Sequence, residues 1–406
     1  MPLTPEESIE SHRSAFASAT YRRYFPSAVF STLGSWLLRF LLGWSAWELT
    51  ESATWVGIVA GLTLAPALLL SPLFGIVADR VNPRNGLLLT ITLQAFFAGV
   101  AGIAVLFDIF TLSALLTLAT ALGITTSAHT PIRLALIPLL VTRPALPSAI
   151  GYSAMVFNTS RILGPALGAW LISQGSTALA YCVAGGLMLS ALPNLWLAHV
   201  VPPATQDSAD ASFRQQLTDG LRYTRNHQTI RVVFGFTLVN ALLGRTIIEL
   251  LPALSGLLLQ GDSSSLATLT AAAGAGSIIG GLVVSRQRGS QYDLQRLLAL
   301  SLLSSAVVVT GLSFGGQLIK VSLLISLLSL TATMAGTSSQ ALAQLLVEDG
   351  YRGRVLSLWT MIAMGAPAAG AMTMGSLADW LSFPPVLLGF ALAGGLVTLG
   401  LYRAVR

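Results

Sequence analysis

Long apolar runs separated by short polar breaks repeat along nearly the whole chain. A helix needs about 20 apolar residues to cross the ~30 Å hydrocarbon core of a bilayer, and these runs have that length. Their punctuation by Gly, Pro or charge predicts twelve membrane-spanning helices. The spans are expected at 26–49, 55–78, 86–107, 110–130, 148–173, 177–200, 231–252, 266–285, 294–314, 318–341, 355–380 and 384–402.

Composition supports a polytopic membrane protein. Of 406 residues, 54% are hydrophobic and 9% are charged, whereas a soluble domain has about 25% charged residues. The net charge of +6 is spread over many loops, so no nucleic-acid partner is expected. One cysteine, Cys182, excludes an intramolecular disulfide.

The basic residues predict the orientation. If the N-terminus is cytoplasmic, 18 of the 22 basic residues fall in the tails and inner loops, and only Lys320 lies at an outer loop. This asymmetry is the one that the positive-inside rule describes. We therefore expect a multi-pass protein of the cytoplasmic (inner) membrane with both termini cytoplasmic.

A polar stretch near residue 204 divides the chain into related halves. The sequence Gly281 to Arg286 repeats Gly75 to Arg80 at an offset of 206, with Ser285 in place of Asp79. A shared offset near half the chain length predicts two pseudo-symmetric six-helix bundles. The expected parts are a tail at 1–25, bundles at 26–203 and 231–406, and a linker at 204–230.

The linker itself carries an amphipathic pattern. Phe213, Leu217 and Leu221 are spaced four apart with arginines beside them. Such a helix suits an anionic membrane surface. A plain linker helix is favoured, and docking of a partner is the alternative; no obligate protein partner is implied.

The loop after the second span concentrates charge. It contains Gly75, Asp79, Arg80 and Arg84, and charges are too costly to face lipid. The pattern resembles the signature loop of the major facilitator superfamily. That resemblance implies a cytoplasmic latch, in which Asp79 faces the start of the eleventh helix in the outward-open state. A solvated turn that only sets topology is the alternative.

The fifth span carries a second motif of small residues and proline. Glycine allows close helix packing and Pro165 bends the helix. The spacing resembles the antiporter motif of proton-coupled exporters, although any bent, closely packed span would show it too. Its residues are Gly151, Asn158, Arg161, Gly164, Pro165 and Gly168, with Ser160 where the motif has glycine.

The resemblance extends to one branch of the superfamily, the enterobactin exporters and macrolide efflux proteins. Segments typical of that branch are Gly34-Ser35-Trp36, Glu48-Leu49-Thr50, Pro131-Ile132-Arg133, Asn158 to Pro165, Gly220 to Tyr223, Leu250-Leu251-Pro252 and Arg352 to Val355. Leu139 departs from it, because members often have an acid there. The resemblance implies a secondary transporter that works by alternating access.

Charged and aromatic residues inside the spans are the candidates for substrate and proton. Charges there face the bundle interior or a cavity; they are Arg39, Glu48, Arg161, Arg245 and Glu249. Glu249 is the first candidate as proton carrier, although Arg245, four residues away, could simply neutralise it. Arg39 is the first candidate for substrate, and Trp36, Phe40 and Trp44 share its helix at intervals of four.

These observations predict proton-coupled efflux of a medium-sized amphipathic compound, siderophore-like or drug-like. Uptake or lipid transport on the same fold is the alternative. A membrane enzyme is disfavoured because the four histidines lie in separate segments, and ATP-driven transport because Lys320 lies in no phosphate-binding loop. No metal site and no cofactor are expected, and the proton gradient would supply the energy.

Overall fold

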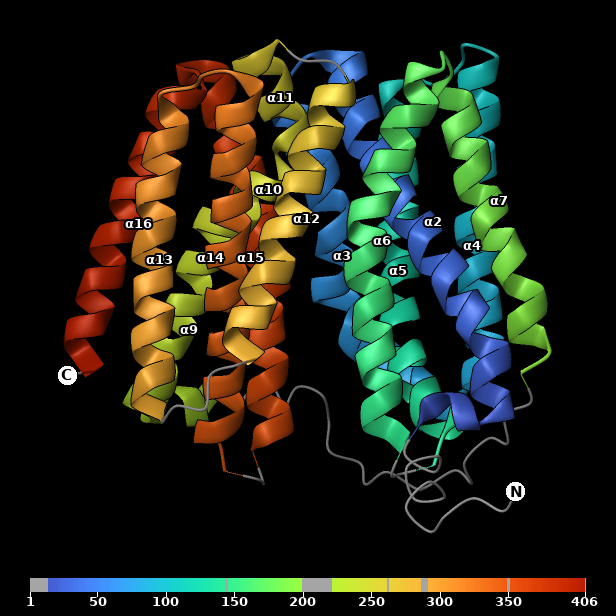
Figure 1. The fold of residues 1–406 in the computed structure, drawn as a ribbon, viewed down its shortest axis with the longest axis horizontal. Coiled ribbons are helices and arrows are strands. Elements are labelled where there is room, and N and C mark those ends of the chain that lie inside the picture. Colours follow the sequence, from blue (N-terminus) through green and yellow to red (C-terminus); the bar gives the residue numbers. More distant parts are fainter. Residues whose placement is uncertain are drawn as a thin grey trace, which may run out of the picture. The chain divides into compact units, whose positions relative to one another are not determined.

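The computed structural model describes residues 14–142, 145–198, 221–260, 263–285, 291–348 and 351–405, where the regular elements are helical (Figure 1). The first half holds η1 (Ala15–Ala17), α2 (Ala19–Thr50), α3 (Ala53–Arg80), α4 (Pro83–Leu106), α5 (Leu112–Leu140), α6 (Leu146–Ser173) and α7 (Thr177–Trp196). The second half holds α9 (Gln228–Asn240), η3 (Ala241–Arg245), α10 (Thr246–Glu249), α11 (Leu251–Leu259), α12 (Ser263–Ser285), α13 (Gln291–Ser313), α14 (Leu318–Leu346), α15 (Arg352–Leu381) and α16 (Phe383–Val405).

These helices confirm the twelve predicted spans. Eleven spans are single helices in the described residues, and the seventh is built from α9, η3, α10 and α11 in succession. Five boundaries were wrong by more than a turn. α2 begins at Ala19 rather than at residue 26, and α5 continues to Leu140 rather than 130, with Pro131 and Pro138 inside it. The other three are helix ends, which lie at Trp196 rather than 200, at Leu259 rather than 252 and at Leu346 rather than 341. Membrane helices tolerate such prolines because neighbouring groups satisfy the freed backbone atoms.

The chain groups into two compact units. One comprises Met1–Leu42 and Leu69–Ser208, and the other comprises Gly43–Leu68 and Ala209–Arg406. The end of α2 and the start of α3 therefore pack within the same unit as the C-terminal helices. The division into tail, bundles and linker made from the sequence stays a prediction, and residues 1–13 of the tail and 204–220 of the linker lie outside the described residues.

In the unit that contains Leu69–Ser208, α4 packs against both α5 and α7. Glycine makes the α4–α7 approach possible, because a Cβ on Gly102 would lie 2.8 Å from the Cys182 sulfur. Polar side chains join the helices as well: Ser35 donates to Gln94, and Thr90 is hydrogen-bonded to His129. His129 thus has a structural partner in the neighbouring helix.

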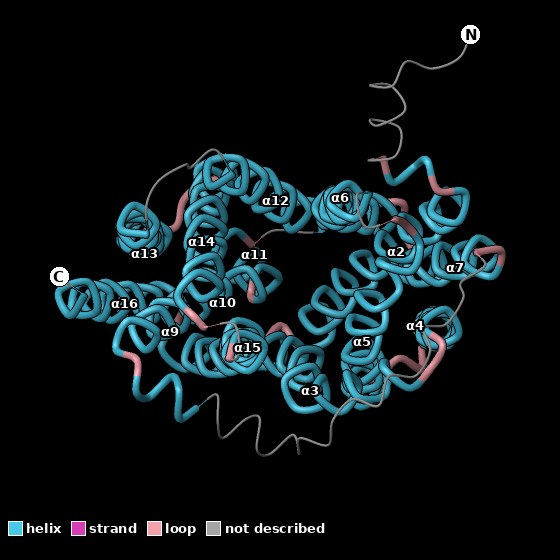
Figure 2. Tube along the Cα trace, turned by 90° about the horizontal axis from the view of Figure 1, so that it is seen from below, coloured by secondary structure: helices cyan, strands magenta, loops and turns pink. Residues whose placement is uncertain are grey.

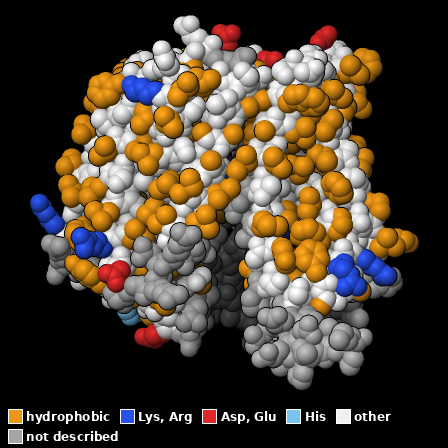
Figure 3. Space-filling model, in the orientation of Figure 1, with side chains coloured by type: hydrophobic (Ala, Val, Ile, Leu, Met, Phe, Trp, Pro, Cys, Tyr) orange, Lys and Arg blue, Asp and Glu red, His pale blue; other side chains and the backbone are white. Residues whose placement is uncertain are grey.

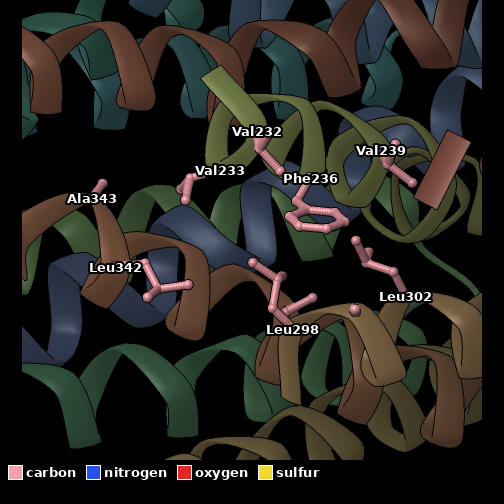
Figure 4. Close-up of a cluster of buried hydrophobic side chains, with 10 residues drawn as sticks. Val232, Val233, Phe236, Val239, Leu298, Leu302, Leu342 and Ala343 are labelled. Carbon is pink, nitrogen blue, oxygen red and sulfur yellow. The ribbon is translucent and has the colours of Figure 1, made fainter. Parts of the chain in front are cut away.

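In the unit that contains Ala209–Arg406, α13 packs against both α14 and α16 (Figure 2). Its buried apolar cluster brings together α9, α13 and α14 (Figure 4). The cluster comprises Val232, Val233, Phe236, Val239, Leu298, Ala299, Leu302, Ala335, Leu342 and Ala343. The third helix of each half thus contacts the fourth and the sixth of that half, as repeated six-helix bundles require.

The outer sides of the helices expose large apolar side chains (Figure 3). On α13 and α14, Val307 and Leu323 are 72% and 67% exposed. Such continuous apolar surface is unfavourable in water and suits the hydrocarbon of a bilayer. Ten of the described helical segments are long and apolar enough to cross a membrane, which indicates a multi-pass membrane protein.

Candidate functional site

The signature loop is a tight connection between α3 and α4. The side chain of Asn82 accepts a hydrogen bond from the Arg84 backbone N–H at 3.0 Å, and Pro83 is the first helical residue of α4. Asparagine before a helix and proline at its first position are both favoured there. The sequence Asn82-Pro83 therefore stops one span and starts the next within two residues.

The Arg84 guanidinium donates to the backbone carbonyl of Trp196, at the C-terminal end of α7. A positive charge is favourable there because the last carbonyls of a helix lack partners and carry its negative end. Arg84 thus ties the loop to the sixth span. The surroundings of Gly75 and the side chains of Asp79 and Arg80 lie outside what the structure describes, so the latch stays a prediction.

The fifth-span motif forms the contact between α6 and α2. A Cβ on Gly164 would lie 2.8 Å from the backbone nitrogen of Leu37 and 2.8 Å from the Trp36 Cβ. A Cβ on Gly168 would lie 2.6 Å from the Phe40 ring. Both glycines therefore let α6 approach α2 more closely than any other residue would allow.

The other motif residues differ in their surroundings. Gly151 is exposed, and nothing lies within 4 Å of its would-be Cβ. Ser160 and Pro165 are buried. Arg161 interacts with another group, and the side chain of Asn158 lies outside the described residues. The close packing of this motif is thus concentrated in the stretch from Gly164 to Gly168.

The same contact holds two of the aromatic candidates. The Arg39 guanidinium carbon lies 5.6 Å from the Trp36 ring centroid, within cation–π range. Trp36 in turn packs edge-on against Phe157 of α6 at 5.3 Å. Phe40 is 7% exposed and fills the groove at Gly168. Arg39 and Trp36 therefore form a cationic and aromatic pair beside the α2–α6 contact, and Phe40 supports it from the core.

Trp44 and Glu48 belong to the other compact unit, although they continue the same helix. Trp44 is half-buried and Glu48 is exposed. The aromatic series predicted on α2 is thus divided between the two units.

The seventh span is not a continuous α-helix. Ala241–Arg245 form a π-helical turn, in which the Thr246 N–H donates to the Ala241 carbonyl five residues earlier. The helix ends at Glu249 and resumes at Leu251, with Pro252 in its first turn. π-turns inside α-helices occur frequently at functional sites, and interrupted membrane helices line transporter sites.

Arg245 and Glu249 lie at this irregular segment. Arg245 is the last residue of the π-turn and Glu249 is the last residue of α10. Both are half-buried, and both interact with other groups. Asn240, directly before the π-turn, is 5% exposed, and its side-chain oxygen has no hydrogen-bond partner among the described residues. The broken span therefore gathers an acid, a base and a buried amide.

Small residues of the surrounding helices make room for the π-turn. A Cβ on Gly244 would lie 2.7 Å from the Ala332 Cβ of α14. On α15, Gly370 faces the Thr246 hydroxyl. The wider turn is accommodated because these neighbours lack bulky side chains.

Two features of the site were not predicted from the sequence. The π-turn had only the polar Asn240 and the nearby Gly244 as signals. The acid Asp379, at the end of α15, binds the start of α3. It could have been noticed as an acid at a span end, but its partners lie more than 300 residues away in the sequence. In the described part of the chain, no group of three or more His, Cys, Asp or Glu could hold a metal ion.

A family profile described as "transmembrane secretion effector" matches residues 10–404. The chain belongs to this family of major facilitator transporters. The transmembrane secretion effector profile spans both halves, so the resemblance to the major facilitator superfamily is confirmed.

Relatives of this family member include a staphyloferrin A transporter and a macrolide efflux protein. The chain is 27% identical over 366 residues to the staphyloferrin A transporter of Staphylococcus aureus, covering 88% of this chain and 89% of the relative. It is 25% identical over 356 residues to macrolide efflux protein A of Streptococcus pyogenes, covering 82% of each.

Solved structures share the fold. The nucleoside transporter NupG matches with a TM-score of 0.76 at 14% identity, over 95% of this chain and 98% of that one. At this identity the match shows the major facilitator fold alone. Because family and relatives are transporters, the membrane-enzyme alternative is excluded.

Proposed function

We propose that this protein exports a medium-sized amphipathic compound across the cytoplasmic membrane by alternating access, with both termini in the cytoplasm. The observation that carries the proposal is the α2–α6 contact. There Gly164 and Gly168 bring the fifth span onto the first, beside the pair of Arg39 and Trp36. This is the place where the antiporter motif of exporters would act. The family description, secretion, supports the same direction.

The substrate class follows from the groups at this contact. A guanidinium over an indole ring favours a ligand that is aromatic and oxygen-rich or anionic. Staphyloferrin A and macrolides, named for the two relatives, support a siderophore-like or drug-like compound of this kind. Among the arginines of the spans, Arg39 is the candidate we favour, because its guanidinium lies over the Trp36 ring at 5.6 Å beside the α2–α6 contact.

Proton antiport is the proposed energy source. A carboxyl group held in the membrane can take up and release a proton, and Glu249 lies where the seventh span is interrupted. Interrupted helices supply ion and substrate groups in secondary transporters. The exposed Glu48 is the weaker candidate.

The test is transport by everted membrane vesicles, in which export appears as uptake. We expect vesicles containing the protein to accumulate a catecholate siderophore or a macrolide when the interior is acidic, and to lose this accumulation when the pH gradient is collapsed. We expect Glu249→Gln to lose the dependence on the gradient while Glu48→Gln keeps it. Accumulation of the compound by intact cells instead of everted vesicles would favour the uptake alternative and overturn export.

Arg39→Ala should impair transport of anions more than transport of neutral compounds. Losing one charge-assisted contact costs about 1.5–3 kcal/mol, so transport of an anionic substrate should fall by about tenfold or more. Arg39→Lys is the matched variant, because it keeps the charge without the planar guanidinium. Initial rates for one anionic and one neutral substrate measure the effect, and equal losses for both would contradict the proposed role.

A further inference from the structure

Asp379, near the C-terminal end of α15, caps the N-terminal end of α3. One carboxylate oxygen accepts from the Ala53 N–H at 2.9 Å, and the other accepts from the Thr54 N–H at 2.9 Å and from the Ser52 hydroxyl at 2.5 Å. The first N–H groups of a helix lack partners within it and carry its positive end. A carboxylate supplied by a distant helix therefore satisfies them favourably.

Behind this cap the two helices touch backbone to backbone. A Cβ on Gly57 would clash with the Ala371 carbonyl of α15, and a Cβ on Gly375 would clash with the Ala53 carbonyl of α3. All these residues belong to the unit of Gly43–Leu68 and Ala209–Arg406. The start of α3 is therefore held to α15 by small residues and, at the tip, by Asp379.

The opposite ends of the same two helices carry the predicted latch. Asp79 lies at the C-terminal end of α3, and the resemblance points it toward the N-terminal end of α15. At the offset of 206 that relates the halves, Asp79 corresponds to Ser285 and Asp379 corresponds to Ser173. Both acids therefore belong to the α3–α15 pair, and both of their counterparts in the α12–α6 pair are serine.

We propose that Asp379 is a second latch, which holds the transporter closed at the membrane side opposite its termini and opposes Asp79. The proposal rests on the alternating access of the proposed function. α3 and α15 run antiparallel, and each would end in an acid that caps the other. A tilt that brings one pair of ends together separates the other pair. Each cap then forms in only one of the two conformations, outward-open or inward-open, and shifts the equilibrium toward that conformation by its interaction free energy.

The first experiment measures the cap itself. Hydrogen exchange of the peptide covering 50–56 is compared between the protein and Asp379→Asn in lipid nanodiscs. We expect exchange at Ala53 and Thr54 to be about tenfold faster in the variant, since charge-assisted bonds to both amides are lost. Asp108→Asn, an exposed acid between α4 and α5, is the matched control and should leave this peptide unchanged. Equal exchange in both variants would overturn the proposal.

The second experiment measures opening. Ala371→Cys, fully buried on α15, is introduced with Cys182→Ser and labelled with a membrane-impermeant maleimide from outside. Labelling should rise severalfold with Asp379→Asn, rise less with Ser52→Ala, stay low with Ser52→Thr, and fall back when Asp79→Asn is added. Faster exchange without a rise in labelling would make Asp379 a purely structural cap and overturn the latch. Neither readout uses a substrate, so a failed export assay with these results intact would overturn only the proposed function.

Discussion

Gly164→Ala should strongly impair both stability and transport. Alanine in a helix interior is favoured over glycine by about 1 kcal/mol, so by propensity alone the change would be stabilising. The added Cβ, however, would lie 2.8 Å from the backbone nitrogen of Leu37 and from the Trp36 Cβ. These atoms belong to the helix frame and cannot rotate away, so α6 must move off α2. Overpacking of this kind costs about 1–3 kcal/mol or more.

Gly151→Ala is the matched control in the same helix and the same motif. Nothing lies within 4 Å of its would-be Cβ, so only the propensity gain remains. We expect Gly164→Ala to unfold in detergent about 1–4 °C below Gly151→Ala. We also expect Gly164→Ala to abolish export and Gly151→Ala to keep it. If the two variants behaved alike, the α2–α6 contact would not be the functional contact of this motif.

The same contact shows what the sequence could and could not predict. Apolar length and punctuation were sufficient for the spans, because the bilayer sets the length of a helix independently of its neighbours. The loop Asn82-Pro83 could be located for a similar reason, since capping is local. Gly164 and Gly151 look equivalent in the sequence, yet among the described residues a Cβ on Gly164 would meet α2, whereas a Cβ on Gly151 would meet nothing within 4 Å. Which glycine is close-packed depends on helix rotation, which the pattern of one helix does not determine.

The seventh span illustrates a second limit. Its apolar pattern predicted one helix at 231–252. In the structure, Ala241–Arg245 form a π-turn and the helical span continues to Leu259. A π-turn is poor by local energy and persists where neighbours accommodate it. Here the accommodation comes from Ala332 and Gly370, on α14 and α15. The role of Asp379 likewise depends on the backbone amides of α3 that it binds. Both features are tertiary, and one helix in isolation does not contain them.

Gly280→Ala should destabilise the C-terminal helices, whereas Gly281→Ala, one residue further along α12, should be neutral. A Cβ on Gly280 would lie 2.5 Å from the Leu330 carbonyl oxygen of α14, while Gly281 has open space around it. α12 and α14 are also joined by a 2.6 Å hydrogen bond between Ser277 and Ser329.

The methyl group of Gly280→Ala would push the two backbones apart and weaken both their dispersion contacts and this hydrogen bond, at a cost of about 1–3 kcal/mol or more. The gain in helix propensity of about 1 kcal/mol is the same in Gly280→Ala and Gly281→Ala. Both variants make the same substitution in neighbouring positions of one helix. A difference in their unfolding temperatures therefore cannot come from composition, from depth in the membrane or from helix propensity. Thermal unfolding of the purified variants measures the difference, with an expected gap of about 1–4 °C. Equal unfolding temperatures would mean that α12 and α14 are not in backbone contact in the membrane.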